Sequence, residues 1–395
     1  MVTSHCPVCA GAALVAFLER DHVPVHQNRV MPTRAGARAA ARGVLKMVVC
    51  RGCGFVFNQG FDAALLQYDQ DYDNTQSHSA MFDQYLDQQV HDLVHRHGVR
   101  GLRVVEVGCG KGHFLRKLVA YPDSGNSGWG FDPTYQGPLS DLGGRLAFER
   151  RFYDAQCVGT PADVVLCRHV IEHVAQPMLL LRAVRAALAQ SPQARVFFET
   201  PCVEWILHNR VVWDFFYEHC SLFSALSLRT AFTLAGFAVT QVSHVFGGQY
   251  LWLEATLATA QGGRPIAVQG ESIAALASAY ARDEIALLHD WDRRLEVWRA
   301  RGPVAVWGAG AKGVTFANLL DPQCRRLDCL VDINPAKHGC HVAGSGHAIV
   351  GPRDLALRGP GTIILMNPNY HQEVQDMLDA LQIDAQLIDW SPGCN

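Results

Sequence analysis

The sequence lacks an excess of charge of either sign. Its 395 residues include 34 Lys and Arg against 37 Asp and Glu, which gives a formal net charge of -3 at pH 7. A chain without a strong positive balance has no electrostatic drive toward the phosphates of nucleic acids or toward an anionic membrane surface. Neither nucleic acid nor a membrane is therefore expected as a partner.

Long apolar runs are also missing. No stretch reaches the ~18 apolar residues of a spanning helix, and Cys6 and Cys9 fall where a secretion signal would have its apolar core. The 13 cysteines are too few in so long a chain for a secreted disulfide scaffold, so we expect a reduced, cytoplasmic protein. With 49% hydrophobic and 18% charged residues the chain can build real cores, and its length predicts two or three domains.

Four of the cysteines form two pairs at metal-ligand spacing, Cys6-Pro-Val-Cys9 and Cys50-Arg-Gly-Cys53, in a segment with little core material of its own. Each Cys-x-x-Cys turn lets two thiolates converge on one ion, and two such turns complete the tetrahedral shell of a structural zinc site. We therefore predict that Cys6, Cys9, Cys50 and Cys53 hold a Zn²⁺ that supports folding only, since a filled shell leaves no open position. The alternative is a pair of redox-active or incidental turns.

The middle of the chain alternates between strand and helix patterns. Strands are predicted at 102–107, 127–132, 145–150, 163–168 and 194–200, with helices at 111–121 and 176–190. This alternation indicates a parallel, doubly wound α/β sheet, and two later strands, 238–246 and 249–257, are placed to close its edge. A long amphipathic helix is predicted over 271–300. A second α/β unit then follows, with strands near 304, 328–332, 362–366 and 386–389.

The first of these strands runs into a glycine-rich turn, Glu106-x-Gly108-x-Gly110-x-Gly112. Glycines are needed where the backbone turns tightly and approaches a ligand without Cβ atoms. A dinucleotide loop would have its last glycine at the next position, which is His113. The loop instead resembles the first motif of class I methyltransferases, in which it holds the methionyl part of S-adenosylmethionine.

Two further strand ends fit the same resemblance. Asp132 ends the next strand, where a carboxylate accepts hydrogen bonds from ribose hydroxyls. The stretch from Asp163 to His173 resembles the fourth motif of these enzymes, whose strand end, here Arg168 and His169, lines the adenine and methyl region of the donor. His173 follows as a substrate contact; for His169 and His173 the alternative is packing at a helix start.

A segment after the 194–200 strand places Tyr217, Glu218 and His219 at the carboxyl edge of the predicted sheet, where ligands bind in such folds. It resembles the active-site stretch of the sugar C-methyltransferase family, whose members act on nucleotide-linked ketodeoxysugars. The resemblance extends over almost the whole chain, because that family also has a four-cysteine zinc module, a class I methyltransferase domain and a C-terminal domain of nucleotide-binding topology.

The resemblance implies a role for each residue of this segment. Carbon becomes nucleophilic only when a proton α to a carbonyl is removed. The family's proposed base is here His219, and Glu218 would orient it or contact the sugar. The family's usual enolate donor is a Tyr two residues before the Glu, but Phe216 stands there and Tyr217 follows; Gln249 stands where the family often has Ser in contact with substrate. The alternative is that the Tyr-Glu-His run lies on an edge or loop surface.

The second α/β unit also carries a glycine loop, Gly308-x-Gly310-x-x-Gly313, with Asp332 ending the next strand. On spacing alone this is a dinucleotide fingerprint. The resemblance implies support of a nucleotide-sugar substrate instead; a bound dinucleotide and a scaffold role stay open. Residues 367–371 are predicted to be only a polar loop, without a partner for hydride transfer.

These expectations combine into one enzyme. The predicted parts are a zinc-binding module (1–60), a helical connection contributing to the donor site (61–98), a methyltransferase domain (99–262), a long linking helix (263–300) and a Rossmann-like substrate-support domain (301–395). The predicted reaction is C-methylation of a ketosugar nucleotide or similar precursor. The alternatives are an O- or N-methyltransferase acting on a small natural-product precursor and a non-catalytic zinc and nucleotide-binding module; the oligomeric state stays open.

Overall fold

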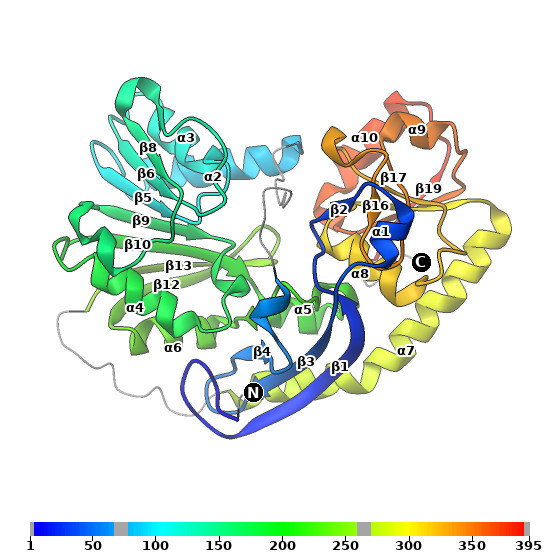
Figure 1. Ribbon diagram of the computed structural model, residues 1–395, viewed down its shortest axis with the longest axis horizontal. Coiled ribbons are helices and arrows are strands. Elements are labelled where there is room, and N and C mark those ends of the chain that lie inside the picture. The colour runs from blue at the N-terminus through cyan, green and yellow to red at the C-terminus, as the bar shows by residue number, and fades with distance from the viewer. Residues whose placement is uncertain (1–3, 67–77, 259–269, 391–395) are drawn as a thin grey trace.

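The computed structural model describes residues 4–66, 78–258 and 270–390. It has two α/β lobes that are joined below by a smaller sheet from the N-terminal segment and by one long helix (Figure 1). Within the described residues, no helix has both the length and the apolar character that crossing a membrane requires.

The first lobe is built on an eight-stranded sheet in the order β12-β13-β10-β9-β5-β6-β8-β7. Five neighbouring strands are parallel, and β13 runs antiparallel to both β10 and β12. The expected doubly wound sheet is confirmed, and this arrangement is the class I methyltransferase fold. The strands are β5 (Arg103–Val107), β6 (Ser127–Phe131), β7 (Ser140–Asp141), β8 (Leu146–Glu149), β9 (Val164–Arg168), β10 (Arg195–Pro201), β12 (Phe237–Val245) and β13 (Tyr250–Leu257).

The central strands of this sheet lie in the core because their side chains are apolar. Val104, Val105, Val164 and Val165 are each completely buried, as expected for parallel strands covered by helices on both faces. Their carboxyl ends meet at one edge of the sheet, which faces the second lobe. The helices of this lobe are α2 (Ala80–His95), α3 (His113–Ala120), α4 (Pro177–Ala187), α5 (Val203–His208) and α6 (Ala225–Leu234).

The N-terminal segment forms a sheet that it shares with the first lobe. Its order is β1-β3-β4-β11, in which β11 belongs to the methyltransferase part of the chain. The expectation of little core material here is corrected: side chains such as Leu45, Met47 and Val49 are fully buried, in a core shared with the long helix. The elements are β1 (Leu14–Pro24), α1 (Arg34–Arg38), β3 (Arg42–Cys50), β4 (Val56–Asn58) and β11 (Ser221–Leu222).

The second lobe is a parallel sheet in the order β17-β15-β14-β18-β19, reached through the helix α7 (Glu271–Arg301). The N-terminal segment also contacts this lobe, because β2 (Val30–Met31) pairs with β16 (His341–Val342). Residues 4–66 therefore bridge both lobes. The remaining elements are β14 (Val304–Trp307), α8 (Ala311–Leu320), β15 (Cys329–Val331), β17 (Ile349–Val350), α9 (Pro352–Ala356), β18 (Thr362–Leu365), α10 (His371–Ala380) and β19 (Gln386–Asp389).

Candidate active site

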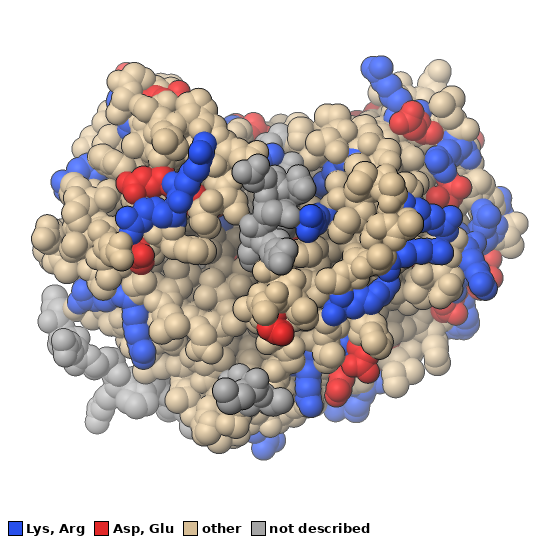
Figure 2. All heavy atoms as spheres, in the orientation of Figure 1, with Lys and Arg blue, Asp and Glu red and all other residues tan. Residues whose placement is uncertain are grey.

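A cavity of about 1600 Å³ lies between the two lobes, and Figure 2 shows the surface recessed there. Its wall combines the glycine loop after β5, the carboxyl ends of β6, β9 and β10, the segment before β11 and the glycine loop after β14. The predicted donor loop, the segment that carries His219 and the second glycine loop therefore reach one space.

The three glycines of the first loop share a positive φ but differ in the space around them. All have positive φ, at 67° for Gly108, 52° for Gly110 and 73° for Gly112, a region that costs other residues about 1–2 kcal/mol. A Cβ on Gly108 would lie 2.3 Å from Val170, and one on Gly112 would lie 2.5 Å from Phe148. A Cβ on Gly110 would meet no described atom within 4 Å, because this glycine borders the open cavity.

Two predicted carboxylates stand at this end of the cavity. Asp132 accepts hydrogen bonds from the Gly110 backbone N–H at 2.9 Å and from the Thr134 N–H and hydroxyl at 2.8 and 2.7 Å. Glu106 is almost completely buried, and its Oε2 has no hydrogen-bond partner among the described residues. Burial raises the pKa of Glu106 to about 8. A bound ammonium group would favour the charged carboxylate again, so this buried oxygen fits the ammonium group of a methionyl moiety.

A buried charge network lies beneath the cavity at the ends of β9 and β10. Glu199 accepts hydrogen bonds from Tyr85 at 2.7 Å and from Arg168 at 3.0 Å, and its Oε1 lies 2.6 Å from Nε2 of His169. The other ring nitrogen of His169 lies 3.3 Å from Glu172. Burial alone would lower the pKa of His169, but the two carboxylates outweigh it and raise that pKa to about 9.

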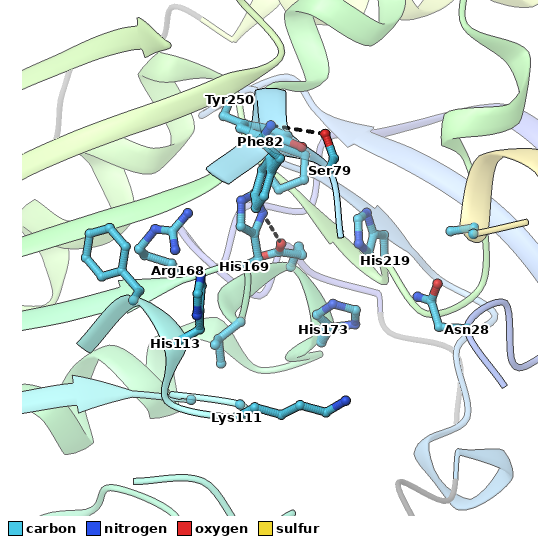
Figure 3. A pocket seen from close by; sticks show the side chains of 18 of the residues that line it. Asn28, Ser79, Phe82, Lys111, His113, Arg168, His169, His173, His219 and Tyr250 are labelled. Carbon is cyan, nitrogen blue, oxygen red and sulfur yellow. Dashed lines mark hydrogen bonds and ion pairs between the residues drawn. The ribbon is translucent and has the colours of Figure 1, made fainter. Parts of the chain in front are cut away.

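This network determines how Arg168 and His169, which were predicted to line the methyl-donor site, are oriented. Both line the cavity (Figure 3), yet Arg168 donates a hydrogen bond to Glu199, and the two ring nitrogens of His169 face Glu199 and Glu172. His169 therefore carries a charge that the two carboxylates hold in place. We conclude that Arg168 and His169 shape the wall of the cavity with ring and stem atoms.

The predicted base His219 stands farther along the same wall, opposite His173 (Figure 3). The two rings are 4.8 Å apart in an edge-to-face arrangement, and a nitrogen of each lies within 4.8 Å of a carboxylate oxygen of Glu172. Burial, helped by the nearby charges of His173 and His169, lowers the pKa of His219 well below its usual value of 6.5. His219 is therefore a neutral proton acceptor at pH 7.

The structure corrects the expectation for Tyr217. Its hydroxyl turns away from the cavity, where it accepts a hydrogen bond from the Asp62 N–H at 2.8 Å and donates one to the Asp62 carbonyl at 3.2 Å. Its ring packs so closely on Gly43 that a Cβ there would lie 2.3 Å from the Tyr217 ring. The side chain that faces the cavity beside His219 is that of Phe216, with ring centroids 4.1 Å apart. The phenol of Tyr217 is therefore not part of the cavity wall beside His219.

Glu218 also turns away from the cavity, with a completely buried side chain. Its two carboxylate oxygens accept hydrogen bonds from the Gln27 N–H at 3.0 Å and from the Asn28 side-chain amide at 3.2 Å. The predicted contact of Glu218 with a sugar, or with the ring of His219, is thus replaced by contacts with the N-terminal segment.

Gln249 lines the cavity as a bridge between the lobes. Its amide exchanges two hydrogen bonds with the amide of Asn367, at 2.8 and 3.1 Å. The neighbouring Asn369 donates to the Phe246 carbonyl at 3.1 Å. Residues 367–371 are therefore more than the predicted polar loop, because they fasten the second lobe to the turn between β12 and β13.

The acid of the second glycine loop is already paired. Asp332 accepts a hydrogen bond from the Ala309 N–H at 3.2 Å and lies 3.0 Å from the Lys337 ammonium. A dinucleotide would need this carboxylate for a ribose hydroxyl. The pairing favours a role for this loop in shaping the cavity, whose wall includes Gly308, Gly310 and Gly313.

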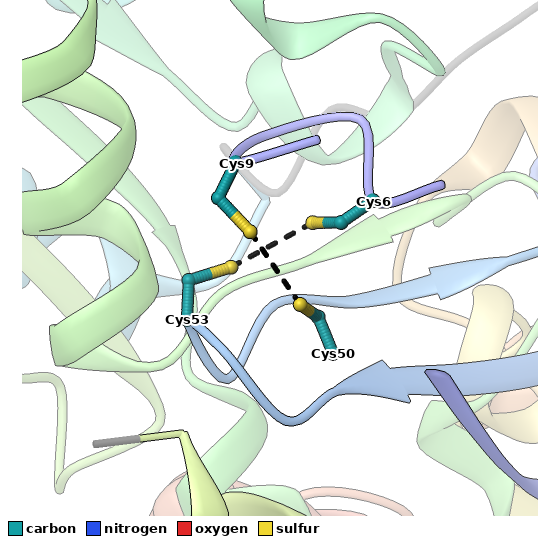
Figure 4. Close-up of side chains that lie close together, drawn as sticks. All are labelled: Cys6, Cys9, Cys50 and Cys53. Carbon is teal, nitrogen blue, oxygen red and sulfur yellow. Dashed lines mark hydrogen bonds between the residues drawn. The ribbon is translucent and has the colours of Figure 1, made fainter. Parts of the chain in front are cut away.

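The four predicted zinc ligands come together in one cluster (Figure 4). The sulfurs of Cys6 and Cys53 are 3.6 Å apart, and those of Cys9 and Cys50 are 3.5 Å apart. Four thiolates bound tetrahedrally at ~2.3 Å would have their sulfurs about 3.8 Å apart. The cluster therefore fits a Zn²⁺ at its centre, with each Cys-x-x-Cys turn supplying two ligands.

Several wall and network residues were absent from the sequence analysis. Glu199 and Glu172 had a usable signal, since the first ends the predicted 194–200 strand and the second lies inside the Asp163–His173 stretch. Tyr85 and Asn28 had none, because their approach depends on tertiary packing. Lys312, which pairs with Asp214 at 2.8 Å, stands inside the second glycine loop and was overlooked there.

Comparisons with known proteins support this picture. A family model described as a methyltransferase domain matches residues 80–242, and one described as a C-methyltransferase C-terminal domain matches residues 279–388. No curated protein matches the chain.

Among solved structures, the Burkholderia thailandensis 1,6-didemethyltoxoflavin-N1-methyltransferase with bound S-adenosylhomocysteine is 15% identical, with 46% of this chain and 82% of that chain covered and a TM-score of 0.35. Magnesium protoporphyrin IX methyltransferase from Synechocystis PCC 6803, also with the bound demethylated donor, is 19% identical, with 45% and 84% covered and a TM-score of 0.34. The strand order of the first lobe defines the fold of this chain.

The family models and the strand order together define the class of protein: the chain is an S-adenosylmethionine-dependent methyltransferase. Its second lobe is a C-methyltransferase C-terminal domain.

The loop geometry predicts how donor affinity responds to substitution. Gly110→Val should weaken binding of S-adenosylhomocysteine by about 10²-fold or more, because backbone strain adds to the loss of open space. Asp132→Ala should weaken it by about 10- to 10²-fold, through lost hydrogen bonds to a charged acceptor. Calorimetry measures both. Gly359→Val is the matched control, since Gly359 has a similar φ of 57° and open surroundings but lies outside the cavity wall. Wild-type protein that binds NAD and not the demethylated donor would contradict this assignment.

Proposed function

We propose that the chain methylates a carbon atom α to a carbonyl, in a nucleotide-linked ketodeoxysugar or a similar precursor. The observation that carries the proposal is the position of His219. It stands on a cavity wall that continues to the loop of Gly108 and Gly110, in a segment that resembles the active site of sugar C-methyltransferases. The base and the donor site therefore open into one space.

His219 provides the first step. With its lowered pKa the imidazole is neutral at pH 7, so its free nitrogen accepts the α proton while the C–H electron pair moves into an enolate. Glu172, whose carboxylate lies within 4.8 Å of the imidazole nitrogens, offsets the positive charge that then develops on His219.

The second step needs an aligned donor and a polarised carbonyl. S-adenosylmethionine, when bound, supplies an electrophilic methyl group whose transfer leaves a neutral thioether. We assign Gly108, Gly110, Gly112, Asp132 and Glu106 to holding it, with Arg168 and His169 shaping the wall. With Tyr217 turned away, His173 lies beside His219 and can donate a hydrogen bond to the enolate oxygen.

The size of the cavity supports a large acceptor. At about 1600 Å³ it exceeds the ~300–1,000 Å³ of common small-molecule sites, so a donor and a second ligand of nucleotide-sugar size can share it. Its far wall belongs to the C-methyltransferase C-terminal domain, through Trp307, Asn334 and Lys337 among others. This domain would hold the nucleotide end of the acceptor, and the Lys337–Asp332 pair argues against a redox dinucleotide there.

A direct experiment separates this function from its alternatives. Wild-type protein, a panel of nucleotide-linked ketodeoxysugars and the demethylated donor are incubated in deuterium oxide, and the α position is followed by NMR. We expect deuterium to replace the α hydrogen, because proton removal no longer leads to methyl transfer.

A second measurement uses a donor with a ¹³C-labelled methyl group and locates the label in the product. A label on carbon supports the proposal. A label on oxygen or nitrogen would instead make the protein a heteroatom methyltransferase. Tight donor binding without turnover on any member of the panel would favour a non-catalytic module.

A further inference from the structure

The segment that carries His219 is held on both sides of that residue by the N-terminal module, residues 4–66. Before it, the Phe215 carbonyl accepts a hydrogen bond from Arg20 at 3.2 Å. After it, the Cys220 carbonyl accepts one from the Asn58 N–H at 2.9 Å. The strand β11, which begins two residues after His219, pairs with β4 of the module. The backbone around the proposed base is thus fixed by contacts far away in the sequence.

Glu218, the residue directly before His219, also contacts the module. Its carboxylate is completely buried and accepts hydrogen bonds from the Gln27 N–H and the Asn28 amide, while its own N–H donates to Oε1 of Gln27 at 3.4 Å. His26 Nδ1 lies 3.8 Å from the same carboxylate. A buried carboxylate without such donors would be costly, so the loop of residues 26–28 and Glu218 fix each other's place.

The four-cysteine cluster lies at the turn between β3 and β4, and β4 is the strand that pairs with β11 next to His219. The strand β3 ends at Cys50, and β4 begins three residues after Cys53. A metal ion that binds both cysteines therefore fixes the turn between β3 and β4, and β4 in turn pairs with β11. Asn28 of the same module reaches the cavity wall near His219 (Figure 3). The module therefore contacts the His219 segment both through β4 and through the loop of residues 26–28.

We propose that Glu218 is a positioning residue, through which the zinc-bound N-terminal module sets the place of His219 in the cavity. This inference rests on the proposed function, in which His219 is the base. It assigns the module a part in turnover beyond supporting the fold, and it removes Glu218 from direct contact with substrate.

The test compares two substitutions of Glu218. Glu218→Gln keeps an oxygen for the Gln27 N–H, and the Asn28 amide can turn its own oxygen toward the new amide group. We expect its kcat to stay within about 3-fold of wild type. Glu218→Ala loses both contacts and should lower kcat by about 10²-fold with unchanged donor affinity, since a displacement of ~1 Å costs about that much. Asn28→Ala should add little to Glu218→Ala in a double-mutant cycle, because both remove the same contact.

A readout without substrate separates this inference from the proposed function. The ring-proton NMR signal of His219, assigned by its loss in His219→Gln, is titrated in the resting proteins. We expect Glu218→Gln to titrate like wild type and Glu218→Ala to shift toward a solvent-exposed histidine. This comparison holds even if no α exchange occurs. If Glu218→Ala does not fold, Asn28→Ala should show the same shift to a smaller extent.

Two results would overturn the inference. In the first, Glu218→Gln loses as much turnover as Glu218→Ala while the His219 signal stays unchanged, which would make Glu218 a group that acts on substrate or on a proton. In the second, neither Glu218→Ala nor Asn28→Ala changes the His219 signal.

Discussion

Replacement of His219 by alanine should abolish both α-proton exchange and methyl transfer. The expected loss is on the order of 10²–10⁴-fold, the usual contribution of a positioned general base. Donor affinity should remain, because the glycine loop and Asp132 are untouched. Stopped-flow or NMR assays measure the rates, and calorimetry measures the affinity. His289→Ala, at an exposed position of α7, is the matched control. A His219→Ala protein that methylates at a near wild-type rate would reject His219 as the base.

The pH dependence of the exchange follows from the state of His219. Only the neutral imidazole accepts a proton, and the pKa of His219 lies well below 6.5. The neutral form therefore predominates at pH 7, and with the demethylated donor at saturation the exchange rate should stay level from pH 6.5 to 7.5 and fall at more acidic pH. A rate that rises through pH 6.5 would instead indicate a histidine with an ordinary environment.

The central strands of the two lobes were predictable from sequence because they are short and mainly apolar, as in β9 (VVLCR) and β14 (VAVW). The predicted strand 163–168 is observed as β9 (Val164–Arg168), and the predicted helix 271–300 as α7 (Glu271–Arg301). The strands of the N-terminal module were not predicted. In β1, charged residues interrupt the alternation and two register shifts occur against β3, so the period of two that signals a strand is lost.

The geometry of the glycine loop after β5 and the clustering of the four cysteines were predictable because local backbone geometry demands their residues. Gly108 and Gly110 need positive φ, and two Cys-x-x-Cys turns form one ligand shell. The side-chain directions of Tyr217 and Glu218 were harder to predict from the sequence. Their contacts are with residues about 155 and 190 positions away along the chain. Tyr217 and Glu218 form a turn, in which the His219 N–H donates to the Phe216 carbonyl at 3.3 Å, so Phe216 and His219 face the cavity while the two residues between them face the module.

Cys50→Ser should strongly destabilise the module. Cys50 is completely buried in the four-cysteine cluster, and loss of a metal site belongs to the mechanisms that cost about 4 kcal/mol or more. We expect wild-type protein to contain one zinc per chain and the variant to contain far less, with a lower free energy of unfolding in denaturant titrations. The remaining folded variant should still bind the demethylated donor, because the donor loop lies in the other sheet.

Cys329→Ser is the matched control for this change, since Cys329 is equally buried but lies in β15 of the second lobe. It should cost only the ~1–3 kcal/mol of burying a hydroxyl group and should keep its zinc. Because Cys50 ends β3, and β3 reaches His219 through β4 and β11, Cys50→Ser should also lower turnover per folded molecule, and Cys329→Ser should not. Metal analysis well below one equivalent in fresh, unchelated wild-type protein would reject the zinc assignment, and equal losses of stability in the two variants would show that the cysteine cluster holds no metal.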